Sequence, residues 1–184
     1  MSKLFPNAVM RTRAPYRFDI VGSFLRPDSL KQARRRCACG ECSLEEMHLV
    51  EDREIATLIA KEKAVGLPNV TDGEFRRTWW HLDFLFELLG VELAEVEEYS
   101  TKFQAHMHRP VTLKITGKIE FPNAHPFLAH FKALQEEAGG HPVKFTIPSP
   151  SMLRLITCVR TPNPQLIERY AGRNDLLLAD ITAV

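Results

Sequence analysis

Short apolar segments alternate with longer segments of helical periodicity along this chain, and polar turns follow the apolar segments. Residues 18–24 and 67–71 are two such short segments. Two helical patterns lie between them, one from Asp28 to near Gly40 and one from the Ser43–Glu46 capping box to Gly66. Strands that alternate with helices favour a parallel α/β fold, because each helix returns the chain to the start of the next strand.

Extended and helical patterns also occur in the second half of the chain. Residues 111–116 alternate apolar and polar side chains, which predicts a strand, and a helical pattern over 126–138 is closed by two glycines. Residues 143–147 predict a further strand, 165–170 a short helix and 174–184 a last helix. The chain therefore offers enough alternating elements for one α/β domain.

We expect residues 16–184 to form that domain, because 184 residues is an ordinary length for one domain. Residues 1–15 show no periodicity and are interpreted as an N-terminal arm. Residues 91–121 do not follow the alternation, since several glutamates stand beside an extended pattern, and we interpret them as an excursion from the domain. Residues 179–184 lie inside an apolar-periodic pattern without a cap, which predicts a truncated C-terminal end.

The charge and the apolar content exclude two classes of partner. The chain has 24 Lys and Arg against 23 Asp and Glu, a net charge of +1, which produces no field that would attract nucleic acid or an anionic membrane surface. No apolar stretch approaches the roughly 18 residues of a membrane span, and the first ten residues lack the apolar segment of a signal peptide. We therefore expect a cytoplasmic protein with no membrane partner.

Three of the four cysteines, Cys37, Cys39 and Cys42, stand close together in a pattern that suggests a metal site. Structural zinc usually has four ligands in two separated pairs, and the fourth cysteine, Cys158, stands alone. We therefore interpret the three cysteines as small residues in a helix-to-helix turn, and we predict no bound metal. Disulfides are also not expected in a reducing compartment.

Polar turns that follow the predicted strands are the best candidates for a ligand site, because ligands in parallel α/β folds bind where strands end. A glycine lets a backbone N–H approach a carboxylate closely, and the neighbouring serine hydroxyl can also donate, so Gly22 and Ser23 could form a small anion site. Glu74 follows the second strand and could hold an ammonium group. Together these turns could recognise an amino acid, while each turn alone is more often only a turn. A third turn at 148–151 follows a later strand, and no residue is predicted to be catalytic.

Three motifs in this order resemble the cobalamin-independent methionine synthase family, in particular its short, single-barrel bacterial members. They are Val-Gly-Ser-Phe-Leu-Arg-Pro at 21–27, Thr-Asp-Gly-Glu-Phe-Arg-Arg at 71–77 followed by Trp-Trp-His-Leu-Asp-Phe at 79–84, and Ile-Pro-Ser-Pro-Ser-Met at 147–152. The resemblance runs from about Pro15 to the end of the chain. It implies a (β/α)8 barrel of the methionine synthase and uroporphyrinogen decarboxylase type, of which this chain would be the N-terminal part.

The resemblance also implies an activity and roles for the residues that match. The family transfers a methyl group from 5-methyltetrahydrofolate, in its polyglutamate form, to the thiol of homocysteine, which a zinc ion activates. By resemblance, Gly22 and Ser23 contact the homocysteine carboxylate and Glu74 contacts its amino group. Pro148, Ser149 and Ser151 match, more loosely, a segment beside the folate.

Two departures from the family pattern limit the expected activity. A complete barrel needs roughly 250 residues, and the family's zinc ligands, a His-x-Cys pair, a Glu and a later Cys, have no counterpart here. We therefore expect the chain to be inactive alone, to bind no zinc, and to self-associate through open barrel edges. The alternatives are a non-catalytic fragment or degenerate copy that acts as a binding module, and a related barrel that acts on another thiol such as coenzyme M.

Overall fold

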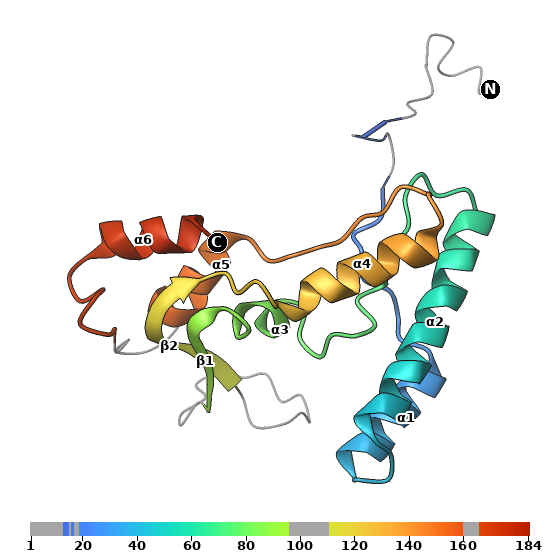
Figure 1. The fold of residues 1–184 in the computed structure, drawn as a ribbon, viewed down its shortest axis with the longest axis horizontal. Helices are drawn as coiled ribbons and strands as arrows, with labels where there is room; N and C mark the ends of the chain where they lie inside the picture. The colour runs from blue at the N-terminus through green and yellow to red at the C-terminus, as the bar shows by residue number, and fades with distance from the viewer. Residues whose placement is uncertain (1–12, 15, 17–18, 96–110, 160–165) are drawn as a thin grey trace. The chain divides into compact units, whose positions relative to one another are not determined.

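The computed structural model describes residues 13, 14, 16, 19–95, 111–159 and 166–184. These residues belong to two compact units (Figure 1). Unit 1 comprises the described parts of Met1–Arg76 and Lys132–Phe145, and unit 2 those of Arg77–Phe131 and Thr146–Val184. The predicted arm lies almost entirely outside the described residues.

Two antiparallel helices, α1 (Asp28–Ala38) and α2 (Leu44–Ala64), form a helical hairpin in unit 1 (Figure 1). Both confirm the periodicity of the sequence, and α2 begins with the predicted capping box, in which Ser43 and Glu46 each accept a backbone N–H. The C-terminal half of helix α4 (Pro126–Ala138) completes the unit. The core of the unit consists of apolar side chains from these helices and from the segments that follow them, namely Leu30, Ile55, Leu58, Ile59, Val70, Phe75, Leu134 and Ala138.

Parallel pairing in unit 1 is limited to an isolated bridge between Val70 and Val143. Val70 donates its N–H to the Pro142 carbonyl at 2.9 Å, and Lys144 donates to the Val70 carbonyl at 2.8 Å. The strands predicted at 67–71 and 143–147 are therefore present as one point of pairing and not as full strands.

The strand predicted at 18–24 is wrong for the part that the structure describes, because residues 19–24 have no strand conformation. Val21 is 81% exposed, whereas Phe24 is partly buried against the core of unit 1. The segment is tied instead by Lys144, whose ammonium group donates to the Asp19 carboxylate at 2.7 Å. The ion pair lowers the pKa of the Asp19 carboxyl group.

In unit 2, strands β1 (Leu89–Glu95) and β2 (Val111–Glu120) pair antiparallel and include the ends of the predicted excursion. The strand predicted at 111–116, within the excursion, is confirmed, and it pairs antiparallel with β1. Residues 96–110 lie outside the described residues. Gly90 has a φ of +75°, and a side chain there would place its Cβ 2.4 Å from the Lys118 carbonyl oxygen, so only glycine allows the two backbones this approach.

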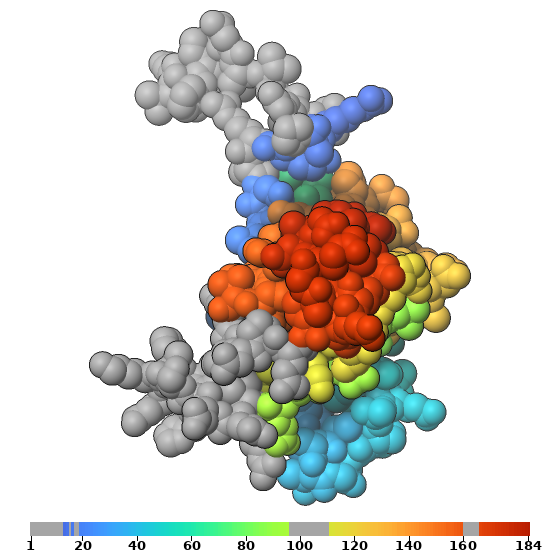
Figure 2. Space-filling view, turned by 90° about the vertical axis from the view of Figure 1, so that its left-hand side faces the viewer, coloured from blue at the N-terminus to red at the C-terminus, as the bar shows by residue number. Residues whose placement is uncertain are grey.

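The remaining helices of unit 2 are α3 (Leu82–Leu85), α5 (Pro150–Arg154), which continues into a π-helical turn (Leu155–Val159), and α6 (Asn174–Thr182). Helix α6 confirms the last predicted helix. The short helix predicted at 165–170 is wrong for its described part, which forms turns. Most of α6 is exposed, as the red surface in Figure 2 shows, but Leu177 and Ile181 are buried.

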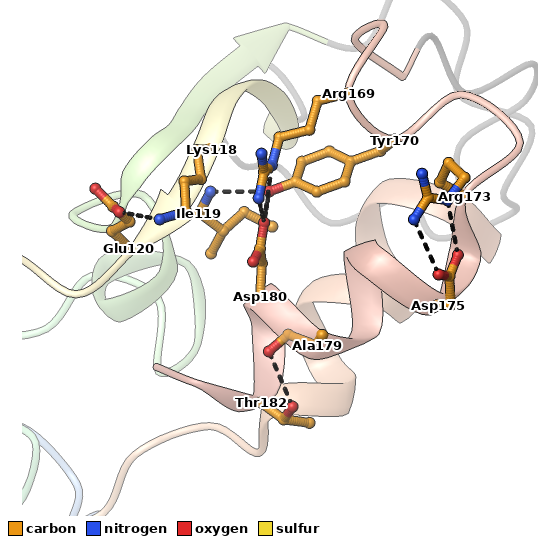
Figure 3. A network of polar contacts seen from close by, with 10 residues as sticks. All are labelled: Lys118, Ile119, Glu120, Arg169, Tyr170, Arg173, Asp175, Ala179, Asp180 and Thr182. Carbon is orange, nitrogen blue, oxygen red and sulfur yellow. Dashed lines mark hydrogen bonds and ion pairs between the residues drawn. The ribbon is translucent and has the colours of Figure 1, made fainter.

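Tyr170 fastens α6 to strand β2 through a network of polar contacts (Figure 3). The tyrosine is fully buried; its hydroxyl accepts a hydrogen bond from the Ile119 N–H at 3.0 Å and donates to the Asp180 carboxylate at 2.7 Å. Arg169 donates to the same carboxylate oxygen at 2.8 and 3.0 Å. The hydrogen bonds from Tyr170 and Arg169 lower the pKa of Asp180, because they favour its charged form.

The described residues form a mixed α/β structure with six α-helices and one two-stranded sheet. No helix in this part of the chain combines the length and the apolar character needed to cross a membrane.

Candidate functional site

Two turns that the sequence singled out meet in unit 1. The Thr71 hydroxyl lies 2.9 Å from the Gly22 carbonyl oxygen and donates to it. The Phe24 N–H donates to the Gly73 carbonyl oxygen at 3.1 Å. The structure therefore brings the turn of Gly22 and Ser23 beside the turn that carries Glu74, although the two are about 50 residues apart in the sequence.

Glu74 has an unusual backbone conformation, with a φ of +58°. Among the described residues other than glycine, it is the one with a positive φ, and this left-handed conformation costs about 1–2 kcal/mol for a residue with a Cβ. Two hydrogen bonds hold it: the Glu74 N–H donates to the Asp72 carboxylate at 3.0 Å, and Arg26 donates to the Glu74 carbonyl at 3.2 Å. Strain of this kind is typical of functional sites, and the residue is only 8% exposed.

The two glycines give the turns their shape. Gly22 is buried with a φ of +130°, and Gly73 has a φ of +64°. A Cβ on Gly73 would lie 2.5 Å from Leu58 Cδ2, so the glycine lets the turn sit directly on helix α2. Ser23, in contrast, is exposed and open to a ligand from solution.

A buried acid that the sequence analysis missed, Glu62, contacts the turn at Thr71. Glu62 of α2 is 2% exposed and accepts the Thr71 N–H at 3.0 Å, while the Thr71 hydroxyl accepts the Gly73 N–H at 3.0 Å. Burial raises the pKa of Glu62, and the nearby Asp72 raises it further. The signal was present in the sequence, because Glu62 falls at the positions three and four residues after the apolar Ile59 and Leu58.

A second buried acid, Glu51, forms ion pairs with two arginines near the Glu74 turn. Glu51 of α2 is 2% exposed and pairs with Arg34 at 3.4 Å and with Arg76 at 3.6 Å. Arg34 also donates to the Phe75 carbonyl at 2.6 Å. Burial raises the pKa of Glu51, and the two arginines oppose that rise. Arg76 is thus engaged by Glu51, and also by Asp52, on the surface of α2.

The third predicted turn lies in unit 2, where its serines begin helix α5. The Ser149 hydroxyl accepts the Ser151 N–H at 3.3 Å and lies 2.5 Å from the Ser151 hydroxyl. Pro148 lines an apolar pocket together with Leu153 of the same helix. The sequence analysis missed α5, although a serine followed by proline is a usual start of a helix. A role of Pro148, Ser149 and Ser151 beside a folate stays a prediction.

The described residues contain no group of three or more His, Cys, Asp or Glu side chains that could hold a metal ion. All four cysteines are free thiols, with Cys39 exposed and the others half-buried.

Comparison with known proteins gives relatives that are longer than this chain. No family model matches. The chain is 44% identical over 145 residues to "Uncharacterized protein YxjH" of Bacillus subtilis (strain 168), which covers 77% of this chain and 37% of that protein. It is 42% identical over 147 residues to "Uncharacterized protein YxjG" of the same organism, which covers 80% of this chain and 38% of that protein.

A solved structure from Listeria monocytogenes has a similar fold and a similar sequence. It is the crystal structure of a protein named "Putative Vitamin-B12 Independent Methionine Synthase", with a TM-score of 0.71 and 38% identity, and the match covers 92% of this chain and 46% of the Listeria chain. The chain thus spans less than half the length of these three relatives. Over the matched part, its fold is similar to that of the Listeria protein.

Proposed function

We propose that this chain is part of a methyltransferase of the cobalamin-independent methionine synthase family, and that unit 1 carries the site for the amino-acid end of homocysteine. The observation that carries the proposal is the hydrogen-bonded pairing of the Gly22–Ser23 turn with the Glu74 turn. Similarity to the Listeria protein supports the family, and the pairing supports the site.

The two turns offer opposite chemistry to the two charged groups of an amino acid. Backbone N–H groups at Gly22 and Ser23, with the exposed Ser23 hydroxyl, are donors for a carboxylate. The Glu74 carboxylate is an acceptor for an ammonium group, and such charge-assisted hydrogen bonds are stronger than neutral ones. Because the turns are hydrogen-bonded to each other, the spacing between donors and acceptor is set before the ligand binds.

We propose a partial (β/α)8 barrel as the architecture of this chain. The parallel bridge between Val70 and Val143 supports it, because neighbouring strands of such a barrel are parallel, and the Glu74 turn follows one of the bridged segments. In barrels of this type the loops after the strands hold the ligands.

The complete reaction would move a methyl group from a nitrogen of 5-methyltetrahydrofolate to the homocysteine sulfur, forming an S–C bond and breaking an N–C bond. Zinc belongs to this family's chemistry, but the described residues do not provide a set of ligands for it, and no step is assigned to it here. We propose that this chain alone binds the amino acid and does not transfer the methyl group.

Calorimetric titration of the 184-residue chain with L-homocysteine and, separately, with coenzyme M tests the proposal. Coenzyme M has a thiol but no ammonium group, so the chain is expected to bind homocysteine in preference. Glu74→Gln keeps the shape of the side chain and removes its charge, and we expect it to weaken homocysteine binding at least about tenfold, equivalent to about 1.4 kcal/mol. Glu137→Gln changes an exposed carboxylate of the same unit and should leave binding unchanged.

Equal affinity of wild type and Glu74→Gln for homocysteine would overturn the assignment of the amino group to Glu74. Preferential binding of coenzyme M would favour a barrel that acts on another thiol.

A further inference from the structure

The chain reverses direction sharply where helix α1 ends. The Glu41 N–H donates to the Arg36 carbonyl at 2.8 Å and the Gly40 N–H donates to the Cys37 carbonyl at 3.0 Å, while Gly40 has a φ of +73°. This is the Schellman pattern, in which a glycine in the left-handed conformation closes the helix and turns the chain back. The residues after Gly40 are therefore directed back along α1.

The reversal brings Cys42 against the side of α1 on which Cys37 lies. The Cys42 thiol donates to the Ala33 carbonyl oxygen, with the sulfur 3.5 Å from that oxygen. Ala33 and Cys37 are one helical turn apart on the same face, and side chains in a helix lean toward its N-terminus, so the Cys37 sulfur is directed toward the Ala33 turn. Both cysteines are half-buried, whereas Cys39 is exposed and, two residues from Cys37, faces another way.

The electrostatics of the Cys42 thiol also reflect its neighbour. Burial raises its pKa most, and the Cys37 thiol, through its charge and its hydrogen bond, raises it further. A thiol with a raised pKa is a poor first nucleophile at neutral pH, but it can act in the second step of an exchange, when its partner already carries a disulfide.

We propose that Cys37 and Cys42 form a reversible disulfide by exchange with a small-molecule disulfide such as oxidised glutathione. In the first step the Cys37 sulfur, having lost its proton, attacks one sulfur of oxidised glutathione, forms a mixed disulfide and releases one glutathione thiolate. In the second step Cys42 loses its proton and attacks the Cys37 sulfur, releasing the second glutathione. Two protein thiols are oxidised, and one molecule of oxidised glutathione is reduced to two of glutathione.

The disulfide would join the last turn of α1 to the residue before the Ser43 cap of α2. Such a bond restrains the hairpin between the two helices in a redox-dependent way. Cys39, exposed beside Arg35 and Arg36, stays outside the bond and could hold glutathione only as a mixed disulfide. The proposal does not depend on the function proposed for the turns of Glu74.

Oxidation of the folded chain with oxidised glutathione, followed by acid quenching, alkylation in denaturant and peptide mass mapping, tests the proposal. We expect wild type, Cys39→Ser and Cys158→Ser to lose two alkylatable thiols to a Cys37–Cys42 bond, and reduced glutathione in excess to restore them. Cys42→Ser should lose this bond and keep a glutathione adduct on Cys37, whereas Cys37→Ser should lose the bond and leave the Cys42 thiol alkylatable. Serine is close in size to cysteine, so the variants should fold, and the circular dichroism of each variant checks this.

A bond between Cys39 and Cys42 that forms in preference would overturn the proposal, as would wild-type protein that retains four alkylatable thiols or accumulates only glutathione adducts. Because the thiols are mapped in wild type as well as in the variants, a variant that fails to fold does not decide the result.

Discussion

The two units each contain a polar network centred on a carboxyl group, and the pKa values of the two groups are shifted in opposite directions. In unit 2, Asp180 is held by the Tyr170 hydroxyl and by Arg169, and these partners lower its pKa (Figure 3). In unit 1, Glu62 is buried below the Gly22 and Glu74 turns, and burial raises its pKa. The first network favours the charged form of its acid, and the second works against it.

This difference separates a network that stabilises the fold from one that fixes a site. The Tyr170 network joins helix to strand with relaxed backbone and an oppositely charged partner. The Glu62 network holds a buried acid and, through Thr71, a turn in which Glu74 adopts a strained conformation. The buried acid and the strained backbone of the second network lower the stability of the fold, which is the usual cost of a preorganised binding site.

The largest expected effect breaks the network of unit 2. Tyr170→Ala removes a fully buried ring together with its hydroxyl, and we expect it to lower the free energy of unfolding by about 3–5 kcal/mol. Tyr170→Phe keeps the ring and should cost about 1–3 kcal/mol, because Ile119 N–H and Asp180 lose their partner. Urea denaturation measures both variants, and neither should alter homocysteine binding by the folded chain. Equal costs for the two variants would show that the hydroxyl, and not the packing of the ring, holds this region.

Thr71→Val tests the network of unit 1. The valine has the shape of threonine but removes the hydroxyl that bonds to Gly22 and Gly73, so we expect a loss of about 1–3 kcal/mol of stability. Homocysteine affinity should fall as well, because the two turns lose one of the hydrogen bonds that join them. Thr57→Val, on the exposed surface of α2, is the matched control. Affinity that stays constant while stability falls would limit Thr71 to a structural role.

Substitution of Glu74 by glycine and by alanine sharpens the comparison. Both remove the carboxylate, but only glycine relaxes the positive φ, so we expect Glu74→Gly to be more stable than Glu74→Ala by about 1 kcal/mol. Both variants should bind homocysteine more weakly than wild type. Thermal unfolding and calorimetry give the two quantities separately. Glycine less stable than alanine would mean that the backbone at this turn relaxes by itself.

The smallest expected effect is on the pH dependence of the free energy of unfolding, to which Glu62 and Asp180 should contribute in opposite directions. The raised pKa of Glu62 means that the native state loses stability as pH rises from the unfolded value of about 4.3 through the native value. Glu62→Gln should therefore gain stability relative to wild type as pH rises through that range. Asp180, whose pKa is lowered, contributes stability that is present above about pH 3.9 and is lost as pH falls through the native value. The stability of Asp180→Asn relative to wild type should therefore be lowest near neutral pH.

Urea denaturation of both variants and of wild type, at several pH values between about 3 and 7, measures these differences. Parallel pH profiles for the two variants would contradict the contrast between the networks.

The longer helices α1, α2, α4 and α6 were predictable from the sequence because their signals are local, whereas the short helix α5 was missed. The capping box at Ser43 and Glu46 and the double glycine after Ala138 lie within a few residues of the helix ends that they define. Strands were less predictable, since a strand needs a partner that its own sequence does not reveal. Residues 18–24 have an apolar pattern, yet their described part pairs with no strand in the described residues.

The candidate site was predictable in its turns and not in its support. Gly22, Ser23 and Glu74 follow apolar segments, and the structure joins their turns even though those segments do not form full strands. Glu62 and Thr71 come together only when the chain folds, because the hydrogen bond between them spans nine residues from a helix to a turn. A charged residue on the apolar face of α2 was the available signal for this pair.

The contact at Gly90 makes mutational tolerance in the hairpin of β1 and β2 uneven. A Cβ at position 90 would collide with backbone atoms of Gly117 and Lys118, and backbone cannot move aside as a flexible side chain can. Gly117 lies opposite, but a Cβ there would meet only the Gly90 Cα, at 3.2 Å. In a library of all single substitutions, position 90 should accept glycine alone, whereas position 117 should accept alanine at the cost of a small backbone shift. A hairpin whose two glycines look equivalent in the sequence would thus tolerate a small side chain at one of them and none at the other.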